Sequence, residues 1–424
     1  MQRREFLVGC SAAIAAMAGS RITGYSFGHA GSPNGDIFIY IFLRGGCDGL
    51  NLVGPANDSS YVVERPPELR VTDSGDNAGL SLKNSLAGLD FRIHPKAAEL
   101  KELYDSNALA VIHGAGLTNG TRSHFDAQDF IERGSLNDKN LSEGWFTRFL
   151  KSSSQPQNSM FRSLAISPVV PSSFLGSNTT VALTNVNDYK LHSDPRLADL
   201  LRTFYKGAQL IDEEANNTLN SIQYMGKQLS SANTGGPVDA AYLKKAGYLE
   251  NNSFSRSLAT LAQVIKMDVN LQVATVDYGG WDTHEHQTNI FNTLTEGLSK
   301  SLGAFYNDIS GYQNRVTVLV MSEFGRRLRA NKSGGTDHGH GNVMLALGGN
   351  VNGGKMYGTW PGLSNEQLDN NVDLAVTTDY RTVLSEVVVR RLRNPKLGYV
   401  FPGLTEYKPL NFLQGEDLPI DFSK

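Results

Sequence analysis

Two short segments of the sequence combine histidine with aspartate, the residue types that bind divalent metal ions in proteins. Four of the nine histidines lie in these segments: His284, His286, His338 and His340. Asp282 stands beside the first pair. Imidazole and carboxylate ligands suit zinc and similar ions. Asp282 and His286 are four residues apart and would share a face of a helical turn. His284 and His286 would share a face only in an extended segment. We therefore predict that some of these residues form a divalent metal site, in which the four histidines do not all bind one ion.

A serine hydroxyl and two arginines are candidates to attack and bind an anionic substrate. Ser123 precedes a predicted helical stretch, where a serine is most often an N-cap. The same position at a helix N-terminus also suits anion binding and the activation of a nucleophile. Arg122 and Arg44 are candidates to clamp an oxyanion. Asp48 lies in a glycine-rich turn, where carboxylates commonly stabilise the turn itself.

Alternating strands and helices must position these groups. Continuous apolar runs predict buried parallel strands at 37–43, 108–113, 163–166, 271–276, 316–321 and 343–347. Apolar residues at helical spacing predict helices at 95–105, 254–267 and 382–392. This alternation predicts an α/β fold, a three-layer α/β/α sandwich with a mostly parallel sheet. In such sheets, ligands bind beyond the carboxyl ends of the strands. The candidate groups lie at such places, in segments 44–51, 121–126, 277–286, 322–327 and 336–342.

The domain organisation follows from the same pattern. Residues from about 190 to 255 have no strand pattern and predict a helical insertion. We therefore expect a single large α/β domain over residues 31–424.

The first 30 residues resemble an export signal. Arg3 and Arg4 are followed at once by the apolar, small-residue stretch 6–18, as in a twin-arginine (Tat) signal peptide. The apolar run is too short for a stable membrane span. These features predict export by the Tat machinery to the periplasm or beyond. Removal of the signal would take Cys10 away and leave Cys47 as the single thiol, without an internal disulfide.

Composition excludes two classes of protein. The formal net charge is −3, so no basic excess exists to bind a nucleic acid strand. With 40% hydrophobic residues the chain is not disordered. Glycine is abundant, at 43 residues, and many of the glycines stand close to the candidate groups.

The order of these motifs has a family resemblance. The chain resembles the alkaline phosphatase superfamily and, more narrowly, the bacterial exported proteins called domain of unknown function 1501. The resemblance rests on segments 44–51, 122–128, 280–284, 322–326 and 337–341. It implies a sulfatase-like fold and the hydrolysis of a small phosphate or sulfate ester with one or two divalent ions, zinc being the expected metal.

The resemblance also implies roles for single residues. Asp282 and His286, completed by His340 or His338, would form one metal site. Asp48 and Glu323 would belong to a second site. Ser123 would be the nucleophile, with Thr121 as the fallback.

The chain departs from the superfamily at two places. Phe324 stands where the superfamily has a bridging histidine, which puts the second ion in doubt. The sulfatase motif Cys/Ser-x-Pro-x-Arg does not occur.

Two functions of different classes remain open. The first is an exported, metal-dependent hydrolase of phosphate or sulfate esters that uses a serine nucleophile. The second is a catalytically silent metal-binding or envelope scaffold protein of the same fold, which the loss of the histidine at Phe324 favours. A Ser-His-Asp esterase is disfavoured, because no Gly-x-Ser-x-Gly elbow stands at a strand end.

Overall fold

A computed structural model describes most of the chain. The described residues are 35–75, 77–153, 161–186, 191, 196–207, 209–229 and 237–423. The predicted signal peptide, residues 1–30, lies outside them. In the described part of the chain, no helix has the length and apolar character needed to cross a bilayer.

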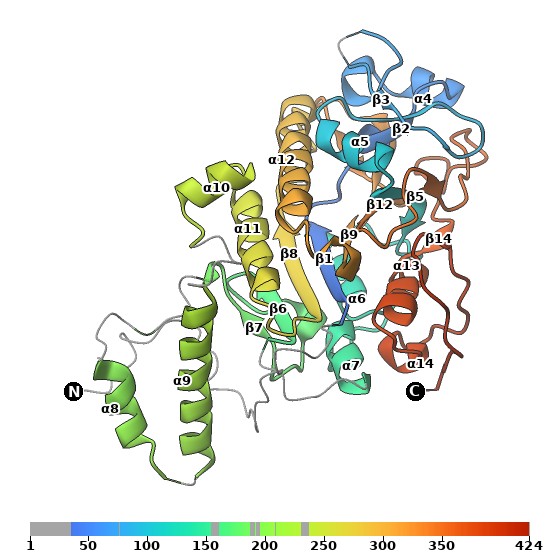
Figure 1. Cartoon of the computed structure of the whole chain (residues 1–424). Coiled ribbons are helices and arrows are strands. Elements are labelled where there is room, and N and C mark those ends of the chain that lie inside the picture. The colour runs from blue at the N-terminus through green and yellow to red at the C-terminus, as the bar shows by residue number, and fades with distance from the viewer. Residues whose placement is uncertain are drawn as a thin grey trace.

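A nine-stranded sheet forms the centre of the molecule (Figure 1). Its order is β13-β5-β12-β9-β1-β8-β6-β7, with β14 paired to β5. Two small sheets, β2-β4-β3 and β10-β11, lie outside it. The strands are β1 Ile37–Leu43, β2 Val53–Pro55, β3 Leu80–Ser81, β4 Phe91–Ile93, β5 Leu109–Gly116, β6 Ser163–Ile166, β7 Val181–Ala182, β8 Val273–Tyr278, β9 Val316–Ser322, β10 Arg326–Ala330, β11 Thr336–His338, β12 Asn342–Leu347, β13 Met356–Tyr357 and β14 Thr378–Asp379.

The sheet is mostly parallel, as the sequence predicts, with one exception. β12 runs antiparallel to both of its neighbours, β5 and β9. The prediction of a parallel strand at 343–347 is therefore wrong. An apolar run shows that a strand is buried on both faces, but it carries no information on direction. Because β12 is reversed, the segment before it lies at the edge where the parallel strands end.

Helices cover both faces of the sheet and complete a three-layer α/β/α sandwich. The helices are α3 Gly49–Leu52, α4 Ser59–Glu64, α5 Ala98–Asp105, α6 His124–Glu132, α7 Trp145–Ser152, α8 Arg196–Phe204, α9 Leu210–Leu229, α10 Ala240–Ala246, α11 Ser253–Lys266, α12 Gln287–Asp308, α13 Tyr380–Glu386 and α14 Leu397–Val400. A π-helical turn, Val387–Arg391, continues α13.

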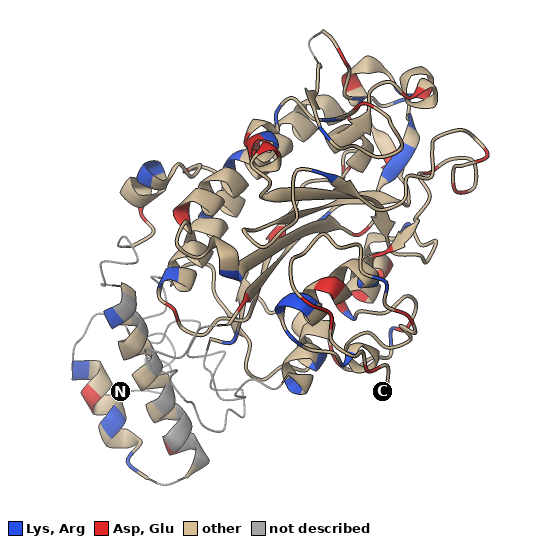
Figure 2. Ribbon diagram, turned by 45° about the vertical axis from the view of Figure 1, so that its right-hand side comes forward, with Lys and Arg blue, Asp and Glu red and all other residues tan. Residues whose placement is uncertain are grey.

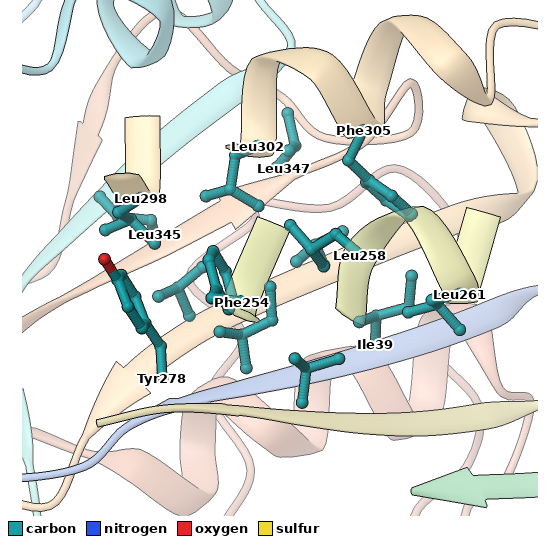
Figure 3. Close-up of a cluster of buried hydrophobic side chains, with 14 of the residues drawn as sticks. Ile39, Phe254, Leu258, Leu261, Tyr278, Leu298, Leu302, Phe305, Leu345 and Leu347 are labelled. Carbon is teal, nitrogen blue, oxygen red and sulfur yellow. The ribbon is translucent and has the colours of Figure 1, made fainter. Parts of the chain in front are cut away.

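The side chains of β1 alternate between two hydrophobic cores. Ile39 and Ile41 face the core formed with α5, α11 and α12. Phe38 and Tyr40 face the core formed with α6, α7, α13 and α14. In the first core, leucines and phenylalanines of α11 and α12 pack over Ile39 (Figure 3). Alternation of this kind is what a strand covered on both faces requires.

Charged residues lie mainly on the helices and loops around the sheet (Figure 2). The central strands β1, β9 and β12 carry none. The functional groups must therefore come from segments that follow or precede the strands.

The described part of the region from 190 to 255 consists of helices and the turns and loops that join them. It contains α8, α9 and α10 and the start of α11, and no strand among its described residues. α8 and α9 lie side by side and away from the sheet (Figure 1). α11 packs on the sheet and belongs to the sandwich itself. That the region is an insertion remains a prediction.

A buried histidine on β5 gives the fold a predicted acid sensitivity. His113 is fully buried, with Nε2 2.9 Å from the carbonyl oxygen of Val53, while Nδ1 accepts from the N–H of Gly114 at 3.1 Å. One ring nitrogen must therefore donate a hydrogen bond and the other must accept one, which only the neutral ring can do. Burial lowers the pKa of His113 to about 4. The unfolded chain binds this proton near pH 6.5, so the free energy of unfolding should fall as the pH falls from about 6.5 toward 4.

Urea denaturation at about pH 7 and about pH 5 measures this effect. The difference between the two unfolding free energies should be smaller in a His113→Gln variant than in the wild type. An equal difference in both proteins would show that His113 does not contribute.

Candidate functional site

Three neighbouring strands end at the same level and define the edge on which the site is built. β1 lies between β8 and β9 and is parallel to both. Leu43, the last residue of β1, pairs with Tyr278 of β8 and Ser322 of β9. The chain segments that begin with Arg44 and Glu323 therefore leave the sheet side by side, next to the segment that leads to Asp282.

Gly45 allows the segment that begins with Arg44 to contact both of the others. Its φ is +121°, and a Cβ atom there would lie 2.5 Å from the backbone nitrogen of Asp282. Its own N–H donates to Oε1 of Glu323 at 2.9 Å. Only glycine fits this conformation and this close approach.

Arg326 fixes the segments to one another. Its side chain is completely buried and donates to the carbonyl oxygens of Gly45, Gly46 and Thr336 at 2.5–2.8 Å. Its Nη2 also donates to Oδ1 of Asp282 at 2.7 Å. Five guanidinium donors in a fixed fork suit such a clamp. The position of Asp282 is therefore set by a buried, rigid partner.

Three ring nitrogens and one carboxylate oxygen converge at this edge. His124, Asp282 and His338 offer ligand atoms within 4.8 Å of one another, the one such group among the described residues. Oδ1 of Asp282 lies 3.2 Å from Nε2 of His338 and 3.5 Å from Nε2 of His124. Nε2 of His284 joins them, 3.1 Å from the same oxygen and 2.9 Å from Nε2 of His338.

Each of the three rings is tethered through its other nitrogen. Nδ1 of His124 lies 2.8 Å from Oε1 of Glu323, and Nδ1 of His338 lies 2.8 Å from the carbonyl oxygen of Arg122. Nδ1 of His284 lies 3.3 Å from Oδ1 of Asp337. Because these oxygens are acceptors, each Nδ1 carries a proton, which leaves the Nε2 lone pairs of the neutral rings directed at the point of convergence.

Local electrostatics keep the carboxylates ionised. Burial raises the pKa of Asp282, but the hydrogen bond from Arg326 and its positive charge act against burial, and this pKa is lowered to about 2. Burial likewise acts against ionised Glu323, yet hydrogen bonds, chiefly from His124 and Gln128, hold its pKa below the ordinary value.

The same contacts act on the histidines. The hydrogen bond to Glu323 raises the pKa of His124, and burial lowers that of His338. The lowered pKa favours the neutral ring of His338, whereas the raised pKa of His124 favours its protonated ring.

The structure brings Asp282 and His338 together but places four other predicted ligands elsewhere. Glu323 supports His124 and is itself buried. His340 is held by Asp369 and by the carbonyl oxygen of Leu117, at 2.8 and 2.9 Å. His286 is exposed, directly before α12 begins. The segment before α12 is not helical, so Asp282 and His286 do not share a helix face.

Asp48, expected at a second metal site, takes part in a buried ion pair. Nη1 of Arg65 lies 2.9 Å from both of its carboxylate oxygens, and both side chains are fully buried. Gln287 donates to Oδ2 at 2.6 Å, and the N–H of Asn51 donates to Oδ1 at 3.2 Å, which makes Asp48 the N-cap of α3. These donors occupy the oxygens that a second ion would need.

The two predicted oxyanion arginines are both paired with carboxylates. Arg44 donates to Glu132 at 2.8 Å and to Asp277 at 3.2 Å. Arg122 forms an ion pair with buried Asp373. Its carbonyl oxygen, and not its guanidinium, contacts the histidine group.

Ser123 is the N-cap of α6, as its sequence position suggests. Its Oγ accepts from the N–H of Asp126 at 3.4 Å. Thr121 accepts from the N–H of Ser123 at 3.2 Å through its own Oγ1. Ser123 thus stands next to His124, at the N-terminus of the helix that carries this histidine.

One member of the converging group, His124, was not among the predicted site residues, and His284 was a candidate histidine without an assigned role. His124 directly follows Ser123 in the sequence, at the start of the predicted helical stretch. A histidine in the first turn of a helix that follows a strand end is the signal that could have found it.

Comparison with known proteins gives a family match and several distant solved structures, three of which are described below. The sequence pattern of the family described as protein of unknown function (DUF1501) matches residues 119–392. No curated protein matches the chain.

The solved structures have low identity to the chain. A structure titled Ps i-CgsB is 9% identical, covers 76% of this chain and 68% of its own, and has a TM-score of 0.33. Its complex with k-i-k-neocarrahexaose is 8% identical, covers 90% and 75%, and has a TM-score of 0.34. BT1596, a 2-O GAG sulfatase, is 11% identical, covers 75% and 65%, and has a TM-score of 0.27.

The family match spans well over half of the chain and includes every residue of the histidine group. The chain belongs to the family of proteins described as protein of unknown function (DUF1501).

Proposed function

We propose that this protein is a hydrolase of phosphate or sulfate esters that depends on one divalent metal ion, zinc being the best fit. The observation that carries the proposal is the convergence of three Nε2 atoms on Oδ1 of Asp282, with every Nδ1 tethered to an oxygen. Tethering of the second nitrogen is typical of histidines that bind metal ions. Nitrogen and carboxylate ligands together suit zinc.

An unpartnered nitrogen supports the fit. Nε2 of His124 is buried and has no hydrogen-bond partner, although buried polar atoms are nearly always paired. His284 and His338 also turn their Nε2 atoms toward each other at 2.9 Å. Two lone pairs at this distance repel unless a proton or a cation lies with them. Ligand atoms about 2.1 Å from one tetrahedral zinc are about 3.3 Å apart, and Oδ1 of Asp282 lies 3.1–3.5 Å from the three Nε2 atoms.

The proposal is for one ion and not two. The residues that would hold it are His124, Asp282, His284 and His338. Asp48 already has a full set of donors within the fold. When bound, the ion would act as a Lewis acid that polarises an ester oxygen and stabilises negative charge.

The charges around the group favour an anionic substrate. Arg326 balances the ionised Asp282 at 2.7 Å. The charge of Glu323 is taken up by three N–H donors, from Gly45, His124 and Gln128. Asp282, Glu323 and Arg326 together carry a net charge of −1, so a bound divalent ion would leave a net positive charge, which attracts an anion. A phosphate or sulfate ester meets this requirement, which a neutral ester would not.

We assign the nucleophile to Ser123. It precedes His124 at the N-terminus of the nine-residue helix α6, where the helix dipole favours a developing negative charge. Its Oγ would attack phosphorus or sulfur, the bond to the alcohol oxygen would break, and the alcohol would leave with the proton of Ser123. Water would then hydrolyse the serine ester, which restores the hydroxyl and releases phosphate or sulfate.

The test of this assignment is a Ser123→Ala variant assayed on aryl phosphates and aryl sulfates. We expect kcat/KM to fall by about a thousandfold or more, because the covalent step is lost. A Thr121→Val variant is the matched control, since it removes the neighbouring hydroxyl. Activity that survives in Ser123→Ala and is lost in Thr121→Val would transfer the role to Thr121. Activity that survives in both would exclude a serine or threonine nucleophile here.

The scaffold alternative predicts a different result. A silent metal-binding protein would bind the ion through the same histidines and yet hydrolyse none of the esters. The wild-type ester assay on the metal-loaded protein therefore separates the two functions. We also propose export through the Tat machinery to the periplasm or beyond, which is supported by Arg3, Arg4 and the apolar stretch after them.

A further inference from the structure

We infer that Gln128 and Arg44 are positioning residues, which hold Glu323 and, through it, direct Nε2 of His124 toward Asp282. This inference rests on the proposed metal centre and identifies what keeps one of its ligands in place. Neither Gln128 nor Arg44 belongs to the converging group itself.

An unbroken chain of hydrogen bonds joins Arg44 to His124. Nη1 of Arg44 donates to Oε1 of Gln128 at 3.0 Å, and Nε2 of Gln128 donates to Oε1 of Glu323 at 2.7 Å. The same glutamate oxygen lies 2.8 Å from Nδ1 of His124. The donors point in one direction from Arg44 through Gln128 to Glu323, so the first bond polarises and strengthens the second, and His124 donates to the same glutamate oxygen.

Arg44 fixes the orientation of the Gln128 amide. A flipped amide would turn its oxygen toward the carboxylate of Glu323 and its NH₂ group toward the guanidinium, so both contacts would become repulsive. Arg44 cannot move away to relieve them, because Glu132 and Asp277 hold the same guanidinium at 2.8 and 3.1 Å. The chain of hydrogen bonds therefore has one stable direction.

Gln128 completes the set of donors around Oε1 of Glu323. This oxygen accepts from the N–H of Gly45 at 2.9 Å, from Gln128 and from His124. Oε2 lies 2.8 Å from Oγ of Ser322. Because Glu323 is fully buried, no water can replace a lost donor without a rearrangement. Without Gln128, Oε1 keeps only Gly45 and His124 as donors, so the carboxylate that orients the ring of His124 is held less firmly.

The test uses a Gln128→Leu variant, which keeps the approximate size and removes the amide. Its affinity for Zn²⁺, measured by competition with a fluorescent chelator, should fall about tenfold, as expected when a partner that orients a ligand is lost. Histidine ¹⁵N chemical shifts of the metal-free protein report the tautomer of His124, whose signals are assigned with a His124→Gln variant. They should show a single Nδ1–H form in the wild type and a mixture of tautomers in Gln128→Leu.

Two further variants serve as a second test and as a control. Gln128→Glu keeps the contact with Arg44 but places a carboxylate against Glu323, so it should lower the affinity as Gln128→Leu does. Asp129→Asn is the matched control, because Asp129 follows Gln128 on α6 but pairs with Arg133 at 2.8 Å, and its affinity should stay within about twofold of the wild type.

The outcomes separate this inference from the metal proposal. An unchanged affinity and an unchanged tautomer in both Gln128 variants would overturn the positioning role. A lower affinity with an unchanged tautomer would overturn the route through Glu323. A wild type that binds no Zn²⁺, together with a changed tautomer in Gln128→Leu, would refute the metal centre and leave the positioning of His124 supported.

Discussion

Replacing Asp282 by asparagine should lower the affinity for Zn²⁺ at least about a hundredfold and abolish ester hydrolysis. Oδ1 of Asp282 is the one anionic atom of the converging group, and it faces the Nε2 atoms of His124, His284 and His338 within 3.5 Å. Asparagine keeps the shape but removes the charge that offsets a divalent ion. Chelator competition measures the affinity, and the melting temperature of the metal-free variant checks that the fold is intact.

Asp369→Asn is the matched control for this variant. Asp369 also pairs with a histidine, His340, at 2.8 Å, but it lies outside the converging group. We expect it to keep wild-type affinity. Equal losses in the two variants would mean that any change of carboxylate near these loops disturbs the protein, and the assignment of Asp282 would fail.

Replacing Arg65 by methionine should destabilise the fold by about 3–5 kcal/mol of unfolding free energy, because it leaves the buried carboxylate of Asp48 without its counter-ion. Both side chains are fully buried, and Arg65 donates to both oxygens of Asp48 at 2.9 Å. Arg65 also donates to the carbonyl oxygens of Leu328 and Arg327, at 3.0 and 2.7 Å. Urea denaturation of the two proteins gives the difference.

The double variant Asp48→Asn with Arg65→Met tests the reason for this loss. It removes the stranded charge, so it should be more stable than Arg65→Met alone. Asp48→Asn alone should keep the wild-type affinity for Zn²⁺. A large loss of affinity in that variant would return Asp48 to the metal site that its sequence position suggested.

The fold could be predicted from the sequence where burial alone decides the pattern. The apolar runs of β1 and β6 coincide with strands that have helices on both sides, and continuous apolar character is the consequence of that environment. The direction of β12 could not be predicted in this way, because the pattern is the same for both directions. The long helix α12 escaped prediction, since small and polar residues separate its core residues Phe291, Leu298 and Phe305.

The candidate site was predictable by region but only partly by residue. Asp282 and His338 were expected at strand ends and do converge there. His286 was chosen for its spacing from Asp282 on a helical turn, but the helix begins only at Gln287. A spacing rule holds only inside the element for which it was derived, and the sequence does not fix where α12 begins to within one turn.

His124 was missed because its partners are distant in the sequence. It meets Glu323 across 199 residues and joins Asp282 only when α6 packs beside the ends of β1 and β9. No local pattern encodes that meeting. The role of Glu323 depends on the same packing. We expected Glu323 to be a metal ligand, but in the structure it is buried and holds His124.

The most direct test of the central claim is the metal content of the wild-type protein, purified without chelators and measured by inductively coupled plasma mass spectrometry. The account predicts about one divalent ion per chain, which is zinc, and its loss in the Asp282→Asn variant. A wild-type protein that holds no divalent ion, and takes up none from a Zn²⁺ solution after extensive dialysis, would contradict it.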